Sequence, residues 1–115
     1  MSGDPALSGD DLVRVLGTLA NPHRLRVIAA LARERAYVSR LARDLGISRA
    51  LLQVHLRKLT AAGLVSAHLE LSEDGKAMKY YEVEPFALRL TPDVIADAVR
   101  TLTPPAAEDR DGDER

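Results

Sequence analysis

The chain has 115 residues, a formal net charge of −1 and no cysteine. This length suits one domain, and the absence of cysteine excludes disulfides and thiolate metal sites. No apolar run approaches the ~20 residues of a membrane span, and the acidic first residues do not resemble a signal peptide, so we expect a soluble cytoplasmic protein that does not enter a membrane.

A leader and two helices are expected at the start of the chain. A helix over residues 9–20 is followed by Asn21 and Pro22, which suit the start of a second helix over residues 22–35, because asparagine caps helices well and proline is tolerated in the first turn. Helical spacing places one apolar stripe on the first helix, formed by Leu12, Val13, Leu16 and Leu19. The inward residues of the second helix are expected to be Leu25, Ile28, Ala29 and Leu31.

The middle of the chain predicts a helix-turn-helix unit. Ser39 and Ser48 are placed to cap two helices, over residues 40–45 and 49–62. Gly46 lies between these helices, and glycine is the residue type that most easily takes the left-handed conformation after a helix. A helix, a short turn with glycine and a second capped helix together make up a helix-turn-helix unit.

A hairpin and a last helix are expected next. The runs 64–71 and 77–83 are strand-like, and the pair Asp74-Gly75 between them is typical of a hairpin, which would form a wing. Thr91 and Pro92 then indicate the start of a last helix, since they offer a cap and a first-turn proline. The apolar residues of this helix are Val94, Ile95, Ala98, Val99 and Leu102.

Charge is unevenly distributed along the chain. Residues 21–60 hold nine basic and two acidic side chains, whereas acidic residues gather near both ends. We expect a flexible leader over 1–8, a winged helix-turn-helix domain for DNA binding and dimerisation over 9–103, and a disordered acidic tail over 104–115. A basic middle between acidic ends is typical of a surface that faces phosphate, although an ordinary solvated helical surface is the alternative on charge alone.

The second helix of the helix-turn-helix is placed to read DNA. Major-groove reading needs a helix that is presented outward on a rigid support. Apolar residues can pack the two helices together: Leu41, Ala42, Leu45, Ile47, Leu52, Leu56 and Leu59. The residues left outward are Arg49, Ala50, Gln53, Val54 and Arg57. Arg49 and Gln53 suit guanine and adenine edges. Other basic residues are expected mainly to neutralise phosphate: Arg57, Lys58, Lys76 and Lys79.

The order and spacing of three segments resemble the arsenic-repressor (ArsR/SmtB) family of bacterial regulators: LANPHRLRVIAAL, LARDLGISRALLQVHLRKLTAAGLV and KYYEV. The resemblance covers about residues 12–83 and implies a mainly α winged helix-turn-helix with a small β-hairpin wing, an α+β fold that dimerises through its first and last helices. It places Tyr80 and Tyr81 in the second wing strand, and Ser48, Arg49, Gln53 and His55 in the recognition helix. The full set of predicted DNA-binding residues is Ser48, Arg49, Ala50, Gln53, Val54, His55, Arg57, Lys58, Lys76 and Lys79. His55 occupies a position that is usually apolar, so a packed ring is the alternative to a phosphate contact there. The predicted dimer interface is Leu12, Leu16, Leu19, Ile95, Val99 and Leu102.

The metal sites of this family are missing from the sequence. Thiol sensors carry Cys-Val-Cys where this chain has Tyr37, Val38 and Ser39, and a phenol and a hydroxyl cannot replace thiolates. Zinc and nickel sensors use Asp and His on the last helix, which here offers Asp93 and Asp97 but no histidine. No two of the three histidines, His23, His55 and His68, are close enough in sequence to chelate from one helix turn. We therefore predict no metal and no cofactor, with a composite imidazole and carboxylate site across the dimer as the alternative.

The sequence thus predicts a DNA-binding transcriptional regulator that binds a pseudo-palindromic operator in double-stranded DNA as a homodimer. Its signal is left open between a regulatory partner protein, a small ligand and a nonstandard nickel or zinc site. The alternative function is a protein-interaction module, in which the winged helix is only a scaffold and the basic helix meets an acidic partner. An enzyme is not expected, because no nucleophile is paired with a base.

Overall fold

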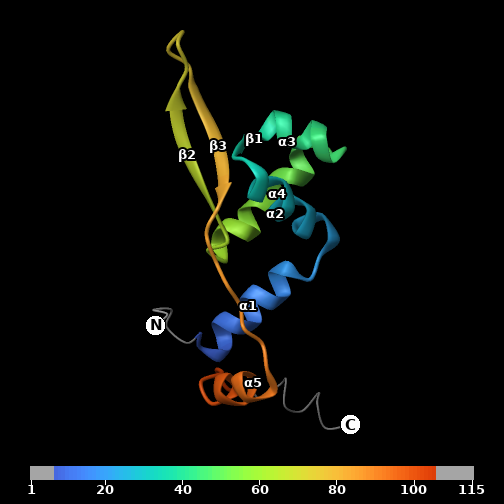
Figure 1. The fold of residues 1–115 in the computed structure, drawn as a ribbon, viewed down its shortest axis with the longest axis vertical. Coiled ribbons are helices and arrows are strands. Elements are labelled where there is room, and N and C mark those ends of the chain that lie inside the picture. The colour runs from blue at the N-terminus through green and yellow to red at the C-terminus, as the bar shows by residue number, and fades with distance from the viewer. Residues whose placement is uncertain (1–6, 106–115) are drawn as a thin grey trace. The chain divides into compact units, whose positions relative to one another are not determined.

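The computed structural model describes residues 7–105 and contains five helices and three strands there. In chain order the elements are α1 (Gly9–Leu19), α2 (Pro22–Arg33), β1 (Ala36–Tyr37), α3 (Val38–Leu45), α4 (Arg49–Ala61), β2 (Val65–Leu71), β3 (Ala77–Val83) and α5 (Pro92–Val99) (Figure 1). The predicted leader and tail lie almost wholly outside the described residues. Within residues 7–105, no helix has the length and apolar character needed to cross a membrane.

The chain divides into two compact units. One holds residues 14–87, and the other joins residues 7–13 with residues 88–105. We call the first the reading unit, because it contains the helix-turn-helix and the wing, and the second the terminal unit.

The reading unit packs four helical segments with a three-stranded antiparallel sheet. The strand order is β1-β3-β2, so β3 is central and pairs with both neighbours. In the hairpin, Val65 lies opposite Val83 and Leu71 opposite Ala77, which confirms the predicted wing. The core is aliphatic, and its most fully buried side chains are Val27, Leu41, Leu52, Leu56 and Leu59. The core therefore joins α2, α3 and α4 and supports α4 along its buried side.

In the terminal unit, the first turn of α1 lies against the end of α5. The Gly9 amide donates to Oγ1 of Thr101 at 2.7 Å, and the Thr103 amide donates to Oδ1 of Asp10 at 3.1 Å. A Cβ on Gly9 would lie 2.3 Å from the carbonyl oxygen of Ala98, so only glycine permits this approach. The contact thus requires glycine at the first position of the helix.

Two local predictions were wrong. In α2, Leu31 is buried and Ile28 packs against the core, as predicted, but the most buried residue is Val27, whereas Leu25 is 54% exposed and Ala29 is exposed. Apolar residues lie on more than one side of this helix, so spacing alone did not decide which stripe the core would cover. Ser39 does not cap α3, because β1 leads directly into a helix that begins at Val38, and the cap position is Tyr37 without a side-chain bond.

Candidate nucleic-acid interface

The turn between α3 and α4 is formed as the sequence predicts. Gly46 takes the left-handed conformation with φ of 71°, and the Ile47 amide then donates to the Ala42 carbonyl at 3.1 Å. The Ser48 hydroxyl accepts a hydrogen bond from the Leu51 amide at 3.0 Å, which caps α4. These local bonds fix the direction in which α4 leaves the turn.

The two sides of α4 differ sharply in burial. Leu52, Leu56 and Leu59 are fully buried in the core, as predicted. The other side carries two rows of residues spaced four apart, so that members of a row are neighbours on the helix surface. The first row is Arg49, Gln53 and Arg57, and the second is Ala50, Val54 and Lys58. Gln53 is half-buried and the other five are exposed.

His55 does not belong to this outward side. It is 5% exposed, and its Nδ1 accepts a hydrogen bond from Nε of Arg24 in α2 at 3.1 Å. Its Nε2 is buried with no hydrogen-bond partner among the described residues. Burial lowers the pKa of His55, and the charges of Arg24 and His23 lower it further. The ring is therefore a neutral core group, unlike the exposed residues of α4 with which it was grouped by sequence.

Several positive charges of residues 21–60 are paired within the chain. Arg35 lies 3.3 Å from the Glu70 carboxylate, and Arg40 forms ion pairs with Glu34 and Asp44. By contrast, Arg49, Arg57 and Lys58 on α4 form no ion pair with any part of the chain that the structure describes. The uncompensated charge on α4 is thus available to an external anion.

A cluster that sequence reasoning missed connects the α2–β1 segment to the wing. The Tyr37 hydroxyl donates to Glu70 at 2.9 Å, and the Arg35 guanidinium carbon lies 4.1 Å from the centroid of the Tyr80 ring. The Tyr80 ring also contacts two other rings: His68, which lies opposite it in the hairpin with ring centroids 5.3 Å apart, and Tyr37, which meets it edge-on at 6.1 Å. Because Arg35 and Glu70 are 35 residues apart, no local pattern could have indicated this pairing.

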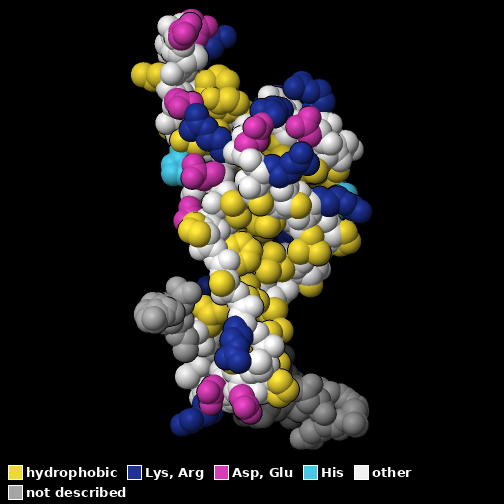
Figure 2. Space-filling model, viewed as in Figure 1, with side chains coloured by type: hydrophobic (Ala, Val, Ile, Leu, Met, Phe, Trp, Pro, Cys, Tyr) yellow, Lys and Arg dark blue, Asp and Glu magenta, His cyan; other side chains and the backbone are white. Residues whose placement is uncertain are grey.

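The wing tip carries both signs of charge. Gly75 has φ of 86°, and the Ser72 amide donates to the Lys76 carbonyl at 2.8 Å, which closes the hairpin. Acidic and basic side chains lie together at this tip (Figure 2), where Glu73, Asp74 and Lys76 are all exposed. A hydrogen bond from the Ser72 hydroxyl lowers the pKa of Asp74. Lys79 is also exposed, further along β3.

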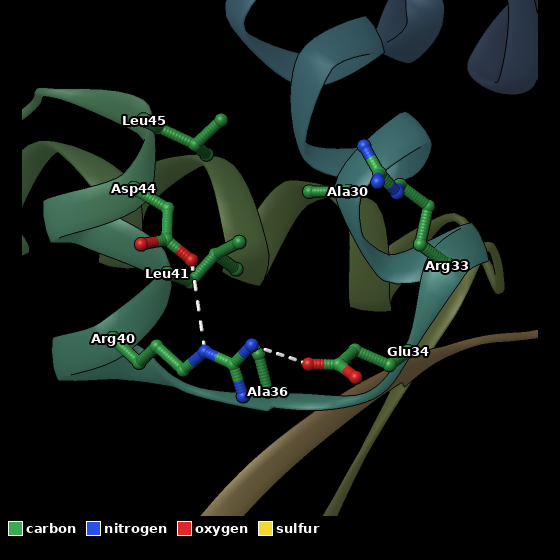
Figure 3. Close-up of a pocket in the computed structure, with 8 residues that line it drawn as sticks. All are labelled: Ala30, Arg33, Glu34, Ala36, Arg40, Leu41, Asp44 and Leu45. Atoms are coloured by element: carbon green, nitrogen blue, oxygen red, sulfur yellow. Dashed lines mark hydrogen bonds and ion pairs between the residues drawn. The ribbon is translucent and has the colours of Figure 1, made fainter.

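A cavity of about 690 Å³ lies between α2 and α3 (Figure 3). Its lining combines apolar and charged side chains: Ala30, Arg33, Glu34, Ala36, Arg40, Leu41, Asp44 and Leu45. Arg40 points between Glu34 and Asp44 and is paired with both. The carboxylates of its lining, Glu34 and Asp44, are both held in ion pairs by Arg40. Residues 7–105 contain no group of three or more His, Asp or Glu side chains that could hold a metal.

The predicted dimer residues fall into two groups. Leu12 is buried at 6% exposure, and Leu19 packs against the core of the reading unit. Leu16 is half-buried. Ile95, Val99 and Leu102 are 43%, 54% and 37% exposed in the single chain. The apolar face formed by Ile95, Val99 and Leu102 is thus exposed to solvent, whereas part of the α1 stripe is already covered.

This geometry has counterparts among known proteins. The model of the family described as bacterial regulatory protein, arsR family, matches residues 21–67, which run from the α2 cap into β2. An uncharacterized HTH-type transcriptional regulator of Methanocaldococcus jannaschii is 32% identical over 85 residues, covering 74% of this chain and 88% of that protein. The chain belongs to the arsR family. It is a transcriptional regulator with a winged helix-turn-helix.

Solved structures share the fold of this arsR-family regulator. The homodimeric winged helix-turn-helix DNA-binding domain of a possible ArsR-family regulator from Mycobacterium bovis is 28% identical, with a TM-score of 0.59 over 72% of this chain and 75% of that chain. NolR from Sinorhizobium fredii is 29% identical, with a TM-score of 0.56 over 76% of each chain. These likenesses confirm the predicted fold class.

The positions at which thiol sensors of the arsR family carry cysteine have other uses in this regulator. The Tyr37 hydroxyl is bonded to Glu70, and that bond raises the pKa of the phenol. Val38 is buried in the core, and Ser39 is exposed. The segment therefore connects α2, the wing and α3.

Proposed function

We propose that this arsR-family regulator binds a pseudo-palindromic operator in double-stranded DNA as a homodimer in the cytoplasm. The observation that carries the proposal is the outward side of α4, where Arg49, Gln53 and Arg57 form one row on a helix held by a fully buried leucine core. A helix of this kind fits the major groove with its first turns toward the base edges.

Two groups of residues have different roles on DNA, one in base recognition and the other in phosphate neutralisation. Arg49 and Gln53 lie near the start of α4, and their side chains suit the paired acceptors of guanine and the donor and acceptor of adenine. Charged residues on the flank of α4 and in the wing neutralise phosphate: Arg57, Lys58, Lys76 and Lys79. Ser48 caps the helix whose first turn approaches the DNA.

The dimer would be formed by the apolar surfaces of α1 and of α5 with the turn that follows it. Ile95, Val99 and Leu102 are exposed in a single chain, and burial of such a face is favourable. The Mycobacterium bovis domain of the same fold is homodimeric, which supports this arrangement. A two-fold dimer presents two copies of α4 and so requires an operator with two related half-sites.

Selection from random duplex DNA tests the function directly. The full chain is incubated with a library of random duplexes, bound DNA is amplified over several rounds, and the enriched sequence is checked by a mobility-shift titration. We expect an inverted repeat with half-sites about one helical turn apart. If no sequence is enriched and the chain instead binds an acidic partner protein, the interaction-module alternative holds. Titrations with nickel, zinc and candidate partner proteins then search for the signal.

Matched variants separate reading from positioning. Gln53→Ala should weaken binding to the enriched operator by about 1–3 kcal/mol per half-site and change binding to random DNA little. Lys79→Ala should weaken both DNAs alike and lower the slope of log affinity against log salt by about one for each phosphate that the variant no longer neutralises. Equal losses on both DNAs for both variants would show that α4 is not the reading helix.

A further inference from the structure

The second row on the outward side of α4 contains two apolar residues. Ala50 and Val54 are four positions apart, so they are neighbours on the helix surface, beside Arg49 and Gln53. Ala50 is exposed and Val54 is 37% exposed. Neither side chain has a polar atom, so neither can bond a phosphate or a base heteroatom.

Alanine is the best helix former, so Ala50 also suits the helix itself, but the fold gives no reason for an apolar side chain at Val54. The core side of α4 is already filled by Leu52, Leu56 and Leu59, which are all 0% exposed. Valine is also a weaker helix former than alanine or the long polar residues, because its branched side chain loses rotamer freedom against the preceding turn. Val54 therefore adds little to the stability of α4, and its chemistry is best explained by what the outward side contacts.

One apolar group is offered by base edges in the major groove, the C5 methyl of thymine. A small residue in the first helical turn, as at Ala50, also lets the helix backbone come close to the base edges. The adjacent Gln53 suits adenine, which pairs with thymine. The polar row and the apolar row therefore both favour an A·T pair.

On the basis of the proposed function, we propose that Ala50 and Val54 contact thymine methyl groups, so that each operator half-site contains A·T pairs read together by Gln53 and this apolar row. The reading surface then recognises a methyl group as well as hydrogen-bonding atoms. It follows that thymine and uracil, which offer the same hydrogen-bonding atoms, are not equivalent to this protein.

The test replaces each thymine of the selected operator, one at a time, by deoxyuridine, which removes only the C5 methyl. Loss of one buried methyl group corresponds to about 0.8 kcal/mol, or about a fourfold weaker affinity. We expect the unaltered protein to lose about fourfold at one or two thymines in a half-site, and about fifteenfold when both half-sites are altered at the same position. Thymines outside the reach of α4 should show no loss.

Variants of the full chain assign the effect to residues. Val54→Ala should bind the thymine operator more weakly and should no longer distinguish thymine from uracil at one position. Val54 is exposed, so this variant should keep the thermal stability of the parent. Gln53→Ala is the matched control, because it should lose preference for adenine while keeping the sensitivity to uracil.

The outcomes separate this inference from the proposed function. If no operator can be selected, both are wrong. If an operator is selected but its half-sites lack thymine, or uracil is neutral at every position, the methyl contact is wrong while DNA reading by α4 stands. The same conclusion follows if Val54→Ala remains as sensitive to uracil as the parent.

Discussion

Arg24 donates a hydrogen bond from Nε to Nδ1 of His55 over 3.1 Å, and its Nη1 donates to the Thr18 carbonyl at 3.3 Å. One side chain of α2 thus connects the last turn of α1 to α4. The bond requires that Nδ1 of His55 be an acceptor, so the ring must be neutral with its proton on Nε2. Protonation of the ring would place two donors, and two positive charges, against each other.

The free energy of unfolding should therefore fall in mild acid. The folded pKa of His55 is lowered, so the unfolded chain binds a proton first as pH falls below about 6.5, the ordinary histidine value. The contribution of the neutral His55 ring to the free energy of unfolding is complete above that pH and is lost as the pH falls toward the folded pKa. Urea denaturation at pH 7.5 and 5.5 measures the loss, and His55→Gln should show a smaller one. His23 and His68 remain in both proteins. An equal loss of stability in the variant would therefore show that a group other than His55 causes the acid sensitivity.

Glycines in the first and last turns of α1 should respond to alanine in opposite directions. In Gly9→Ala the new Cβ would meet the Ala98 carbonyl oxygen at 2.3 Å and Cγ of Leu102 at 2.7 Å, so we expect a loss of about 1–3 kcal/mol. A Cβ on Gly17 would have no neighbouring atom within 4 Å among the described residues, and Gly17→Ala should stabilise the helix by about 0.5–1 kcal/mol. Urea denaturation compares the two, and a stabilising Gly9→Ala would contradict the contact with α5.

Two serines that look alike in sequence should differ in their effect on stability. Ser48→Ala removes the side-chain acceptor that caps α4 and should lower the free energy of unfolding by about 1 kcal/mol. Ser39 is exposed inside the first turn of α3 and makes no capping bond, so Ser39→Ala should be neutral within about 0.5 kcal/mol. Thermal or urea denaturation distinguishes the variants. A loss of equal size in both would restore Ser39 as a cap.

The dimer should depend on the apolar face of α5 and not on its charge. Val99→Glu places a carboxylate on a side chain that is 54% exposed in the single chain, so we expect a folded monomer. Asp97→Lys is the control, since Asp97 lies about 200° around the helix from Val99 and is already solvated. Sedimentation equilibrium gives the mass of each variant. A dimeric Val99→Glu protein with the affinity of the parent would exclude this face from the interface.

Features with a local cause could be predicted from the sequence. Gly46 and Ser48 act through bonds within a few residues, so the turn and the start of α4 followed from residue type and spacing. The side of α2 that is buried depends on neighbours far along the chain, and the prediction there failed at Leu25. The same reason applies to His55, because the bond that holds its ring comes from Arg24, 31 residues away in the sequence.

The hydrogen bonds of Gly9 and Asp10 join residues 92 and 93 positions apart in the sequence. Ribosomes add roughly 5–20 residues per second, so the first turn of α1 is synthesised on the order of ten seconds before Thr101 and Thr103. All residues of the reading unit, 14–87, precede Thr101 and Thr103 in the chain. In a nascent chain, the contacts that join the first turn of α1 to Thr101 and Thr103 therefore become possible only after every residue of the unit 14–87 has been synthesised.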